Sequence, residues 1–487
     1  MQSEDNIIQI RHSTIKREIV KYAILAAIFS ILVVKAYLMI FVINIVIGIY
    51  SFTTTFVLFS LLLISYKFYR DPYYEAKKKL SHYSGEMPLV SIIVPVKNEE
   101  DNIHQCVQSC IDSTYSNKEV IVVNDASTDR TPAILDNMHK EYAELKVLHL
   151  PKNVGKKKAI EAGTELARGE IFVFMDSDCI MANDAVENAV TIFMSDYRIG
   201  AVTAHGRVRD ADKGSALLKL QDTWFDTQFR VLKGMESTFS SLTCCSGSFS
   251  SFRRIAVQPY IHKWAHDRFL GMEFKFATDR RLTAYVLGTK PPANGMLSKD
   301  ANNKDHDTSD GSSILSVTTD DDVHSMKQSA DPYMSDYNQK YLWKLKYSPH
   351  VRVYVSPPKT FGALIKQQIR WRKSFIRSIT ATGGVYWRRP FFAAMLYYLQ
   401  LSLKFVRPYV LINALFVLPL VYHDYYSTLF YATSVFFVGM IYGFDFKINN
   451  PGNNYWLYRP VMSLVSMFIY SWLIFYAAIT IKKTTWR

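Results

Sequence analysis

The chain has 487 residues, a formal net charge of +14, and hydrophobic and aromatic fractions of 49% and 14%. This length is too great for one small domain, and the apolar content is high for a wholly soluble protein. The Lys and Arg residues gather at the borders of apolar segments, which is typical of membrane anchoring and unlike a nucleic-acid-binding face. The five cysteines show no metal-ligand spacing, so we expect reduced thiols in a cytosolic domain.

The first apolar segment predicts a pair of membrane-spanning helices. Residues 1–21 are polar, so we expect a cytosolic N-terminal segment and no cleavable signal peptide. Residues 22–68 are apolar over a length that suits two helices of about 20 residues each, joined by a turn. Basic residues such as Lys21 and Arg70 flank both ends, so we expect both ends of this helical hairpin in the cytosol.

Residues 88–290 alternate strand-like and helix-like patterns, which predicts an α/β domain with a doubly wound parallel sheet. The expected strands are 90–94, 119–123, 146–150, 171–175 and 200–204, with helices over 101–112 and 157–167 among them. Ligands of such sheets bind beyond the carboxyl ends of the strands, where Asp125, Asp176 and Asp178 stand.

The chain after residue 290 divides into three parts. Residues 291–340 are rich in Asp, Ser, Asn and Thr, which predicts a disordered insertion without a catalytic role. Residues 341–390 are expected to end the catalytic domain and to include an amphipathic helix over 361–378 on the cytosolic leaflet.

Residues 391–487 predict transmembrane and interfacial helices. Their apolar bands are 397–421, 426–444 and 461–481. Basic residues lie on both sides of the last band, which favours a re-entrant or in-plane segment there.

The pair Asp176 and Asp178 closes the buried strand 171–175. Two carboxylates at i and i+2 at the end of a parallel strand can hold a divalent cation and, through it, a diphosphate. An ordinary acidic turn is the alternative. Membrane segments on both sides of the domain suggest that a diphosphate donor bound here delivers something to, or across, a bilayer.

Further motifs accompany this pair. They read V-S-I-I-V-P-V-K-N-E-E-D-N from Val90, V-I-V-V-N-D-A-S-T-D-R-T from Val120, N-V-G-K-K-K-A from Asn153, F-A-T-D-R-R-L-T from Phe276 and Q-Q-I-R-W from Gln367. In this order and spacing the chain resembles the family 2 glycosyltransferases, and within them the hyaluronan, chitin and chito-oligosaccharide synthase branch. The resemblance implies a GT-A-like nucleotide-sugar domain, a UDP-sugar donor, and Mg²⁺ or Mn²⁺ bound by Asp178 with Asp176 as its partner.

The same resemblance assigns two residues to the nucleotide. Asp125 matches an acid that contacts uracil, and a carboxylate can accept the hydrogen bond of a pyrimidine N–H. An Asx-turn or a helix N-cap is the structural alternative. Lys156 matches a nucleotide-contacting lysine at the start of a helix, where phosphate is favoured, although a solvated basic face also fits.

Asp279 is the expected general base, because an acceptor hydroxyl is a poor nucleophile until a carboxylate takes its proton. In-line attack on an α-linked donor then gives a β-linked product with inversion. A helix N-cap is the alternative. The chain departs from the family at Thr278, where an acid usually stands, and this removes one negative charge.

Gln367, Arg370 and Trp371 are expected on one face of the interfacial helix, since i, i+3 and i+4 are neighbours there. Arg370 can grip a diphosphate and Trp371 can stack on an acceptor sugar. A membrane-interface Arg/Trp pair is the alternative. In the family this motif marks members that elongate polymers.

The expected function is a membrane-embedded, inverting, processive β-glycosyltransferase that polymerises a UDP-sugar into a hyaluronan-like or GlcNAc polymer. The partners are then a nucleotide sugar, a glycan or lipid-linked acceptor and the bilayer, with no nucleic acid, at the plasma membrane with a cytosolic catalytic domain. Hyaluronan synthases usually continue into further helices beyond the position of Arg487, so a complete translocation pore is not expected. Two alternatives stay open: single transfer to a polyprenyl phosphate or other lipid, and a catalytically inactive membrane scaffold.

Overall fold

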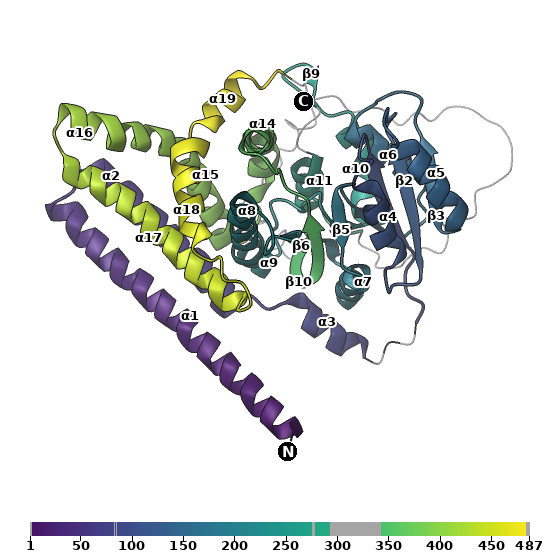
Figure 1. Cartoon of the computed structure of the whole chain (residues 1–487), viewed down its shortest axis with the longest axis horizontal. Coiled ribbons are helices and arrows are strands. Elements are labelled where there is room, and N and C mark those ends of the chain that lie inside the picture. The colour runs from purple at the N-terminus through teal and green to yellow at the C-terminus, as the bar shows by residue number, and fades with distance from the viewer. Residues whose placement is uncertain (1, 82, 84, 275–277, 293–341, 484–487) are drawn as a thin grey trace.

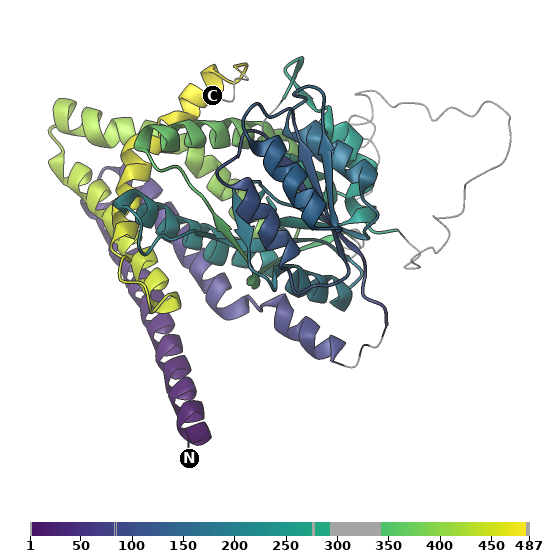
Figure 2. The same cartoon turned by 45° about the vertical axis from the view of Figure 1, so that its right-hand side comes forward.

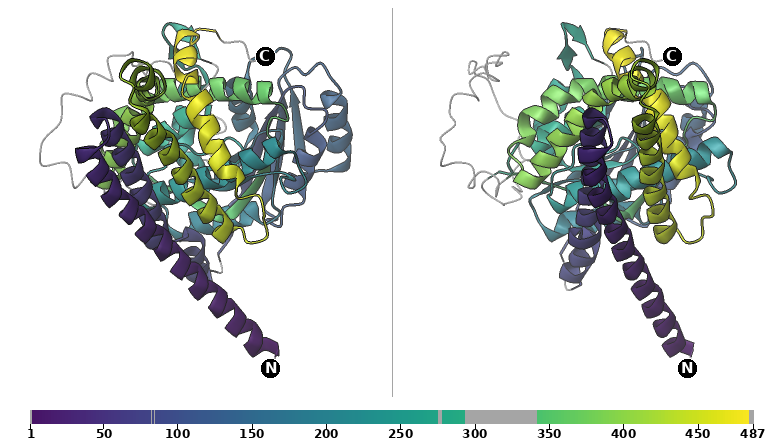
Figure 3. Two further views of the ribbon diagram at one scale, coloured as in Figure 1. Left: turned by 60° about the vertical axis from the view of Figure 1, so that its left-hand side comes forward. Right: turned by 90° about the vertical axis from the view of Figure 1, so that its left-hand side faces the viewer.

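The computed structural model describes residues 2–81, 83, 85–274, 278–292 and 342–483, with side chains from residue 15 on (Figure 1). An α/β domain occupies one side of the molecule and a group of long helices the other. The N-terminal part of α1 (Gln2–Phe41) projects away from both (Figures 2 and 3). Most of the insertion expected over 291–340 lies outside the described residues.

An eight-stranded sheet forms the centre of the α/β domain. Its strands are β1 (Val90–Val96), β2 (Lys118–Asn124), β3 (Leu145–His149), β4 (Ile171–Phe174), β5 (Cys179–Met181), β6 (Ile199–Val208), β7 (Ser250–Arg253) and β10 (Lys344–Val355). Their order is β3-β2-β1-β4-β7-β6-β10-β5. A separate hairpin joins β8 (Arg268–Phe269) to β9 (Met272–Glu273).

The predicted α/β sheet is confirmed, and its two halves differ in direction. From β3 to β4 all neighbours are parallel, as the sequence predicts. Beyond β4 the sheet is mixed: β7 runs antiparallel to both β4 and β6, β10 is parallel to β6, and β5 is antiparallel to β10. Because β10 comes after the expected insertion, residues on both sides of that segment build one sheet.

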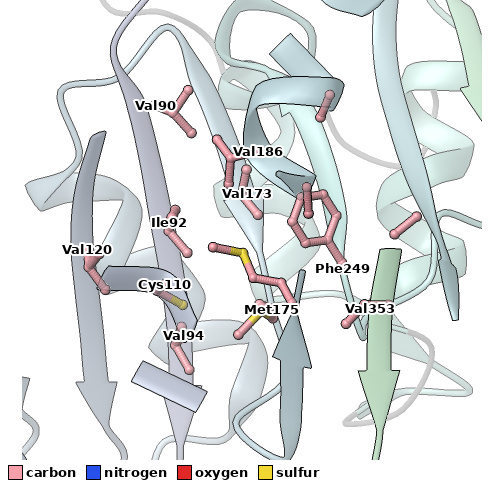
Figure 4. Close-up of a cluster of buried hydrophobic side chains, with 14 of the residues drawn as sticks. Val90, Ile92, Val94, Cys110, Val120, Val173, Met175, Val186, Phe249 and Val353 are labelled. Atoms are coloured by element: carbon pink, nitrogen blue, oxygen red, sulfur yellow. The ribbon is translucent and has the colours of Figure 1, made fainter. Parts of the chain in front are cut away.

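Helices cover both faces of the sheet because its central strands are buried on both sides. Alternate residues of β1 show this: Ile92 and Val94 pack on one face (Figure 4). Ile93 packs on the other face. The first face carries α4 (Ile103–Ile111), α5 (Thr131–Glu141) and α7 (Ala185–Ser195), and the second carries α6 (Lys156–Leu166), α10 (Arg254–Ala265) and α11 (Thr278–Leu287).

Five helical stretches among the described residues are long and apolar enough to cross a membrane, namely Ile15–Phe41, Ile45–Leu80, Phe391–Val421, Tyr425–Asn449 and Tyr458–Ile479. The first two are joined by a turn that ends where Asn44 caps α2 (Ile45–Leu63). The last stretch, expected to be re-entrant or in-plane, is helical over 22 residues and therefore long enough to cross.

The individual helical elements within these stretches and elsewhere in the described chain include η1 (Ile64–Phe68), α3 (Pro72–Leu80), α8 (Ala216–Asp226), η2 (Thr227–Lys233), α9 (Gly234–Thr238), α14 (Phe361–Tyr386), α15 (Phe391–Ile412), η5 (Asn413–Val417), α16 (Leu418–Val421), α17 (Tyr425–Asn449), α18 (Tyr458–Val465), η6 (Ser466–Tyr470) and α19 (Leu473–Ile479). The predicted interfacial helix corresponds to α14, which runs to Tyr386, and α19 packs against it.

Buried ion pairs tie the α/β domain to the apolar helices. Arg230 of η2 contacts Asp226 at 2.7 Å and also contacts Asp445 of α17. The hydroxyl of Tyr66 donates to the same Asp445 at 2.6 Å. Because removal of one partner would leave a buried charge without compensation, this network fixes α17 relative to the α/β domain.

Candidate active site

Asp176 and Asp178 lie directly beyond β4, at the carboxyl edge of the parallel half of the sheet. Ligand atoms of Asp176, Asp178 and Cys179 all lie within 4.8 Å of one another. Burial, and then the charge of Asp176, raise the pKa of Asp178 to about 6. A divalent cation would offset that repulsion, and carboxylate oxygens suit Mg²⁺ or Mn²⁺, so the residues present fit the expected metal.

Lys156 stands at the start of α6 and its amine contacts the carboxylate of Asp176. Burial opposes its charge, but the nearby Asp176 and Asp279 raise the pKa of Lys156 above its ordinary value. The two following lysines point elsewhere: Lys157 is buried, and Lys158 pairs with Glu273 at 2.9 Å. Lys156 therefore brings positive charge to the pair of carboxylates.

Asp125 is 4% exposed and its carboxylate holds the loop that precedes α6. Its oxygens accept hydrogen bonds from the backbone N–H groups of Val154 at 2.6 Å and Gly155 at 2.9 Å. Gly155 has a φ of +88°, a conformation that favours glycine. In this structure Asp125 positions the start of α6, and its expected contact with uracil stays a prediction.

Asp279 lies in the first turn of α11 and its carboxylate faces the segment around Gly247. The N–H of Gly247 donates to Oδ2 at 3.0 Å, and the hydroxyl of Thr278 donates to Oδ1 at 2.5 Å. Both bonds orient the carboxylate, so Thr278 supplies a neutral donor where the family usually has an acid. Because these partners lie outside the amide groups of α11, the geometry is unlike that of a helix N-cap.

Gln367, Arg370 and Trp371 of α14 line a cavity of about 310 Å³. Asp176, Asp178 and Asp279 line the same cavity. The amide oxygen of Gln367 is buried and has no hydrogen-bond partner within the described part of the chain. The indole of Trp371 stacks on Trp224 of α8, with ring centres 5.8 Å apart and an interplanar angle of 17°.

Six of the eight predicted site residues thus line one cavity. Lys156 is not part of the lining but contacts Asp176, which is. Asp125 is not part of the lining either, and it accepts a hydrogen bond from Gly155, the residue before Lys156. Sequence reasoning did not single out Trp224, which belongs to no recognised motif. Its only signal is the adjacent aromatic pair Trp224-Phe225 on a short amphipathic helix.

A second cavity of about 460 Å³ lies among the apolar helices and shares part of its lining with the first. The shared residues are Trp224, Gln228, Leu232, Arg280, Trp371, Phe375, Gln400 and Lys404. The two cavities are therefore neighbours, and the stacked Trp224 and Trp371 lie at their junction.

The second cavity is lined by basic side chains and, among its described lining residues, by no acidic one. The basic residues are Lys35, Arg280, Arg372, Lys404, Arg407 and Arg459. The side chains of Lys35, Arg372, Arg407 and Arg459 donate hydrogen bonds to neutral groups; Arg407 Nε, for example, donates to the Tyr50 hydroxyl at 3.2 Å. Burial lowers the pKa of Arg372 to about 10, which reflects the cost of placing its charge there.

Comparison with known proteins is consistent with the site. Residues 91–260 match the family model "Glycosyl transferase family 2". A hyaluronan synthase of Streptococcus pyogenes is 22% identical over 469 residues, which is 93% of this chain and 96% of the relative. An N-acetylglucosaminyltransferase of Mesorhizobium japonicum is 31% identical over 211 residues, which is 42% of this chain and only 49% of the relative.

Among solved structures, the mannosyltransferase PcManGT from Pyrobaculum calidifontis in complex with GDP-Man and Mn²⁺ aligns with a TM-score of 0.46 and 16% identity, over 88% of this chain and 98% of that chain. The described sheet, the motifs at its carboxyl edge and the family match agree with one another. The chain contains a Glycosyl transferase family 2 domain.

Proposed function

We propose that the protein is a membrane-embedded, inverting β-glycosyltransferase that uses a UDP-sugar and extends a polysaccharide. The observation that carries this proposal is the continuity of the two cavities. The first is lined by Asp176, Asp178 and Asp279 and by the three side chains of α14, Gln367, Arg370 and Trp371. The second shares part of this lining and lies among the apolar helices. The similarity to hyaluronan synthases over most of both chains supports it.

The residues in and beside the first cavity have separate roles in the proposed reaction. Asp176 and Asp178 would hold Mg²⁺ or Mn²⁺, which when bound neutralises charge on the departing diphosphate. Lys156 and Arg370 add positive charge on the donor side. Asp279, held by Gly247 and Thr278, takes the proton of the acceptor hydroxyl as that oxygen attacks the anomeric carbon.

The charge of the second cavity bears on the product. Removing a charged side chain from water costs several kcal/mol, so basic residues among membrane helices are expected to face a ligand or a pathway. An anionic occupant would add counter-charge beside these basic side chains, whereas a neutral one would not. The cavity therefore favours an acidic polymer such as a hyaluronan-like chain over a neutral GlcNAc polymer.

A second candidate is transfer of one sugar to a polyprenyl phosphate. The same basic lining favours it, because a phosphate group among the apolar helices would also compensate these cations. A catalytically inactive scaffold is disfavoured, since the three aspartates, Arg370 and Trp371 converge on one cavity. We place the protein in the plasma membrane with the catalytic domain in the cytosol.

The test is release of UDP by the purified protein in lipid nanodiscs, with a panel of UDP-sugars offered singly and in pairs. Asp279→Asn should keep donor affinity within a few-fold and cut turnover by about 10²–10⁴-fold. A wild type that releases no UDP from any donor would contradict catalysis. An Asp279→Asn variant as fast as the wild type would contradict the assignment of the base.

The basic cavity needs a separate comparison. Arg407→Gln should shorten the product while UDP-sugar hydrolysis stays close to wild type, because Arg407 lines only the second cavity. Lys482→Gln is the matched control, since Lys482 is exposed beyond α19. Equal product lengths for both variants and the wild type would contradict a role of the cavity charge.

A further inference from the structure

A cluster of two histidines and one glutamate lies where α6 packs against α10, separate from the residues of the active-site cavity. Glu161 projects from α6, and His262 and His266 come from the last turn and the C-terminal cap of α10. One ligand atom from each of the three residues lies within 4.8 Å of the others. No part of the proposed glycosyl transfer uses this cluster.

The geometry of the cluster suits a metal ion. His262 Nδ1 lies 2.7 Å from Oε1 of Glu161, and His266 Nε2 lies 3.2 Å from Oε2. The two imidazole rings have centres 4.5 Å apart because i and i+4 share one helix face. Glu161 is 14% exposed, whereas His262 and His266 are 82% and 46% exposed, so an ion could enter from solvent without any movement of the fold.

The ligand chemistry separates this cluster from Asp176 and Asp178. Two imidazole nitrogens and one carboxylate oxygen form a borderline set that Zn²⁺ accepts with a water in the fourth position. The pair beyond β4 presents carboxylate oxygens, which suit the harder Mg²⁺ or Mn²⁺. The simpler alternative for the cluster is a pair of hydrogen bonds between imidazole and carboxylate.

We propose that Glu161, His262 and His266 form a binding site for a borderline transition-metal cation, with Zn²⁺ as the preferred ion, that bridges α6 and α10. The bridge stabilises the contact between these two helices. Because α6 also begins with Lys156, an ion at Glu161 fixes the helix that delivers Lys156 to the active site.

The experiment uses full-length protein without a polyhistidine tag, in detergent, titrated with Zn²⁺ against a chromophoric chelator. An Asp178→Asn background removes binding at the carboxylate pair. In that background the proposal predicts one bound Zn²⁺, which the combined change His262→Gln and His266→Gln abolishes. His104→Gln, which alters another exposed histidine, is the matched control and should retain the ion.

Thermal unfolding supplies a second readout that needs no activity. Zn²⁺ should raise the Tm of the protein with the intact cluster, whereas Mg²⁺ should not, and the double histidine variant should lose the rise while its Tm without zinc stays unchanged. Glu161→Gln should weaken Zn²⁺ binding. Zinc binding that is unaffected by the double histidine change overturns the site, and binding that is unaffected by Glu161→Gln overturns the bridge between the helices.

Discussion

Gly247 leaves no room for a side chain between its own Cα and the carboxylate of Asp279. A Cβ built on Gly247 would lie 2.9 Å from Oδ1 and 3.0 Å from Oδ2 of Asp279, whereas ordinary contacts begin at 3.4 Å. The carboxylate must therefore move by roughly half an ångström or more in Gly247→Ala, and the hydrogen bond from the Gly247 N–H is strained as well. A displacement of about 1 Å at a reacting group can cost about 10²-fold in rate, which sets the upper limit for this smaller shift.

We therefore expect Gly247→Ala to lower kcat by up to about 10²-fold, which is at most ~2.7 kcal/mol of activation free energy. The KM for the UDP-sugar should change less than kcat, because the side chains assigned to the donor and its metal belong to other residues. UDP release at saturating donor measures this. Gly362→Ala is the matched control, since a Cβ at Gly362 meets no atom within 4 Å. A kcat for Gly247→Ala equal to that of the control would refute the role assigned to the position of Asp279.

Three further predictions concern other parts of the molecule. Asp178→Asn should abolish turnover, and chelation should stop the wild type until Mg²⁺ or Mn²⁺ is restored; full activity in excess chelator would exclude the ion. Trp371→Ala removes aromatic contacts worth about 0.5–1.5 kcal/mol and should shorten the polymer more than it slows donor hydrolysis, whereas Arg370→Ala should impair both reactions equally. Burial opposes the charge of Glu119, but hydrogen bonds, first of all from Lys146, lower its pKa to about 2. The folded-state pKa is thus below the ordinary 4.5, so this carboxylate stabilises the fold above pH 4.5 and loses that effect as the pH falls toward 2. Glu119→Gln should flatten the fall in Tm over that range, and an unchanged acid profile would contradict it.

The parallel half of the sheet could be predicted from sequence because β1, β2 and β4 contain runs of apolar residues. In the mixed half only β6 was predicted, at residues 200–204. β7 shows why the rest was not: Ser250–Arg253 has four residues and no apolar run, so only its neighbours β4 and β6 determine that it is a strand. The position of β10 depends on pairing with β6, which is far away in the sequence.

Some features of the candidate site could likewise be predicted from sequence, and others could not. Asp176 and Asp178 could be placed together because they are two residues apart at the end of one strand, β4. The stacking of Trp371 on Trp224 depends on how α14 packs against α8, and no local pattern specifies that contact. The motif around Asp125 did not predict its hydrogen bonds, because their donors, the N–H groups of Val154 and Gly155, belong to a loop that follows a different strand.

The size of the product made by the purified wild-type protein tests the central claim most directly. The protein, reconstituted in lipid nanodiscs with Mg²⁺ or Mn²⁺ and pairs of UDP-sugars that include a uronic acid donor, should make a long anionic polymer that grows with time. Asp279→Asn, under the same conditions, should make none. A product that never exceeds one sugar on a lipid, with every donor offered, would contradict a polymerase whose active site continues into a basic cavity among the membrane helices.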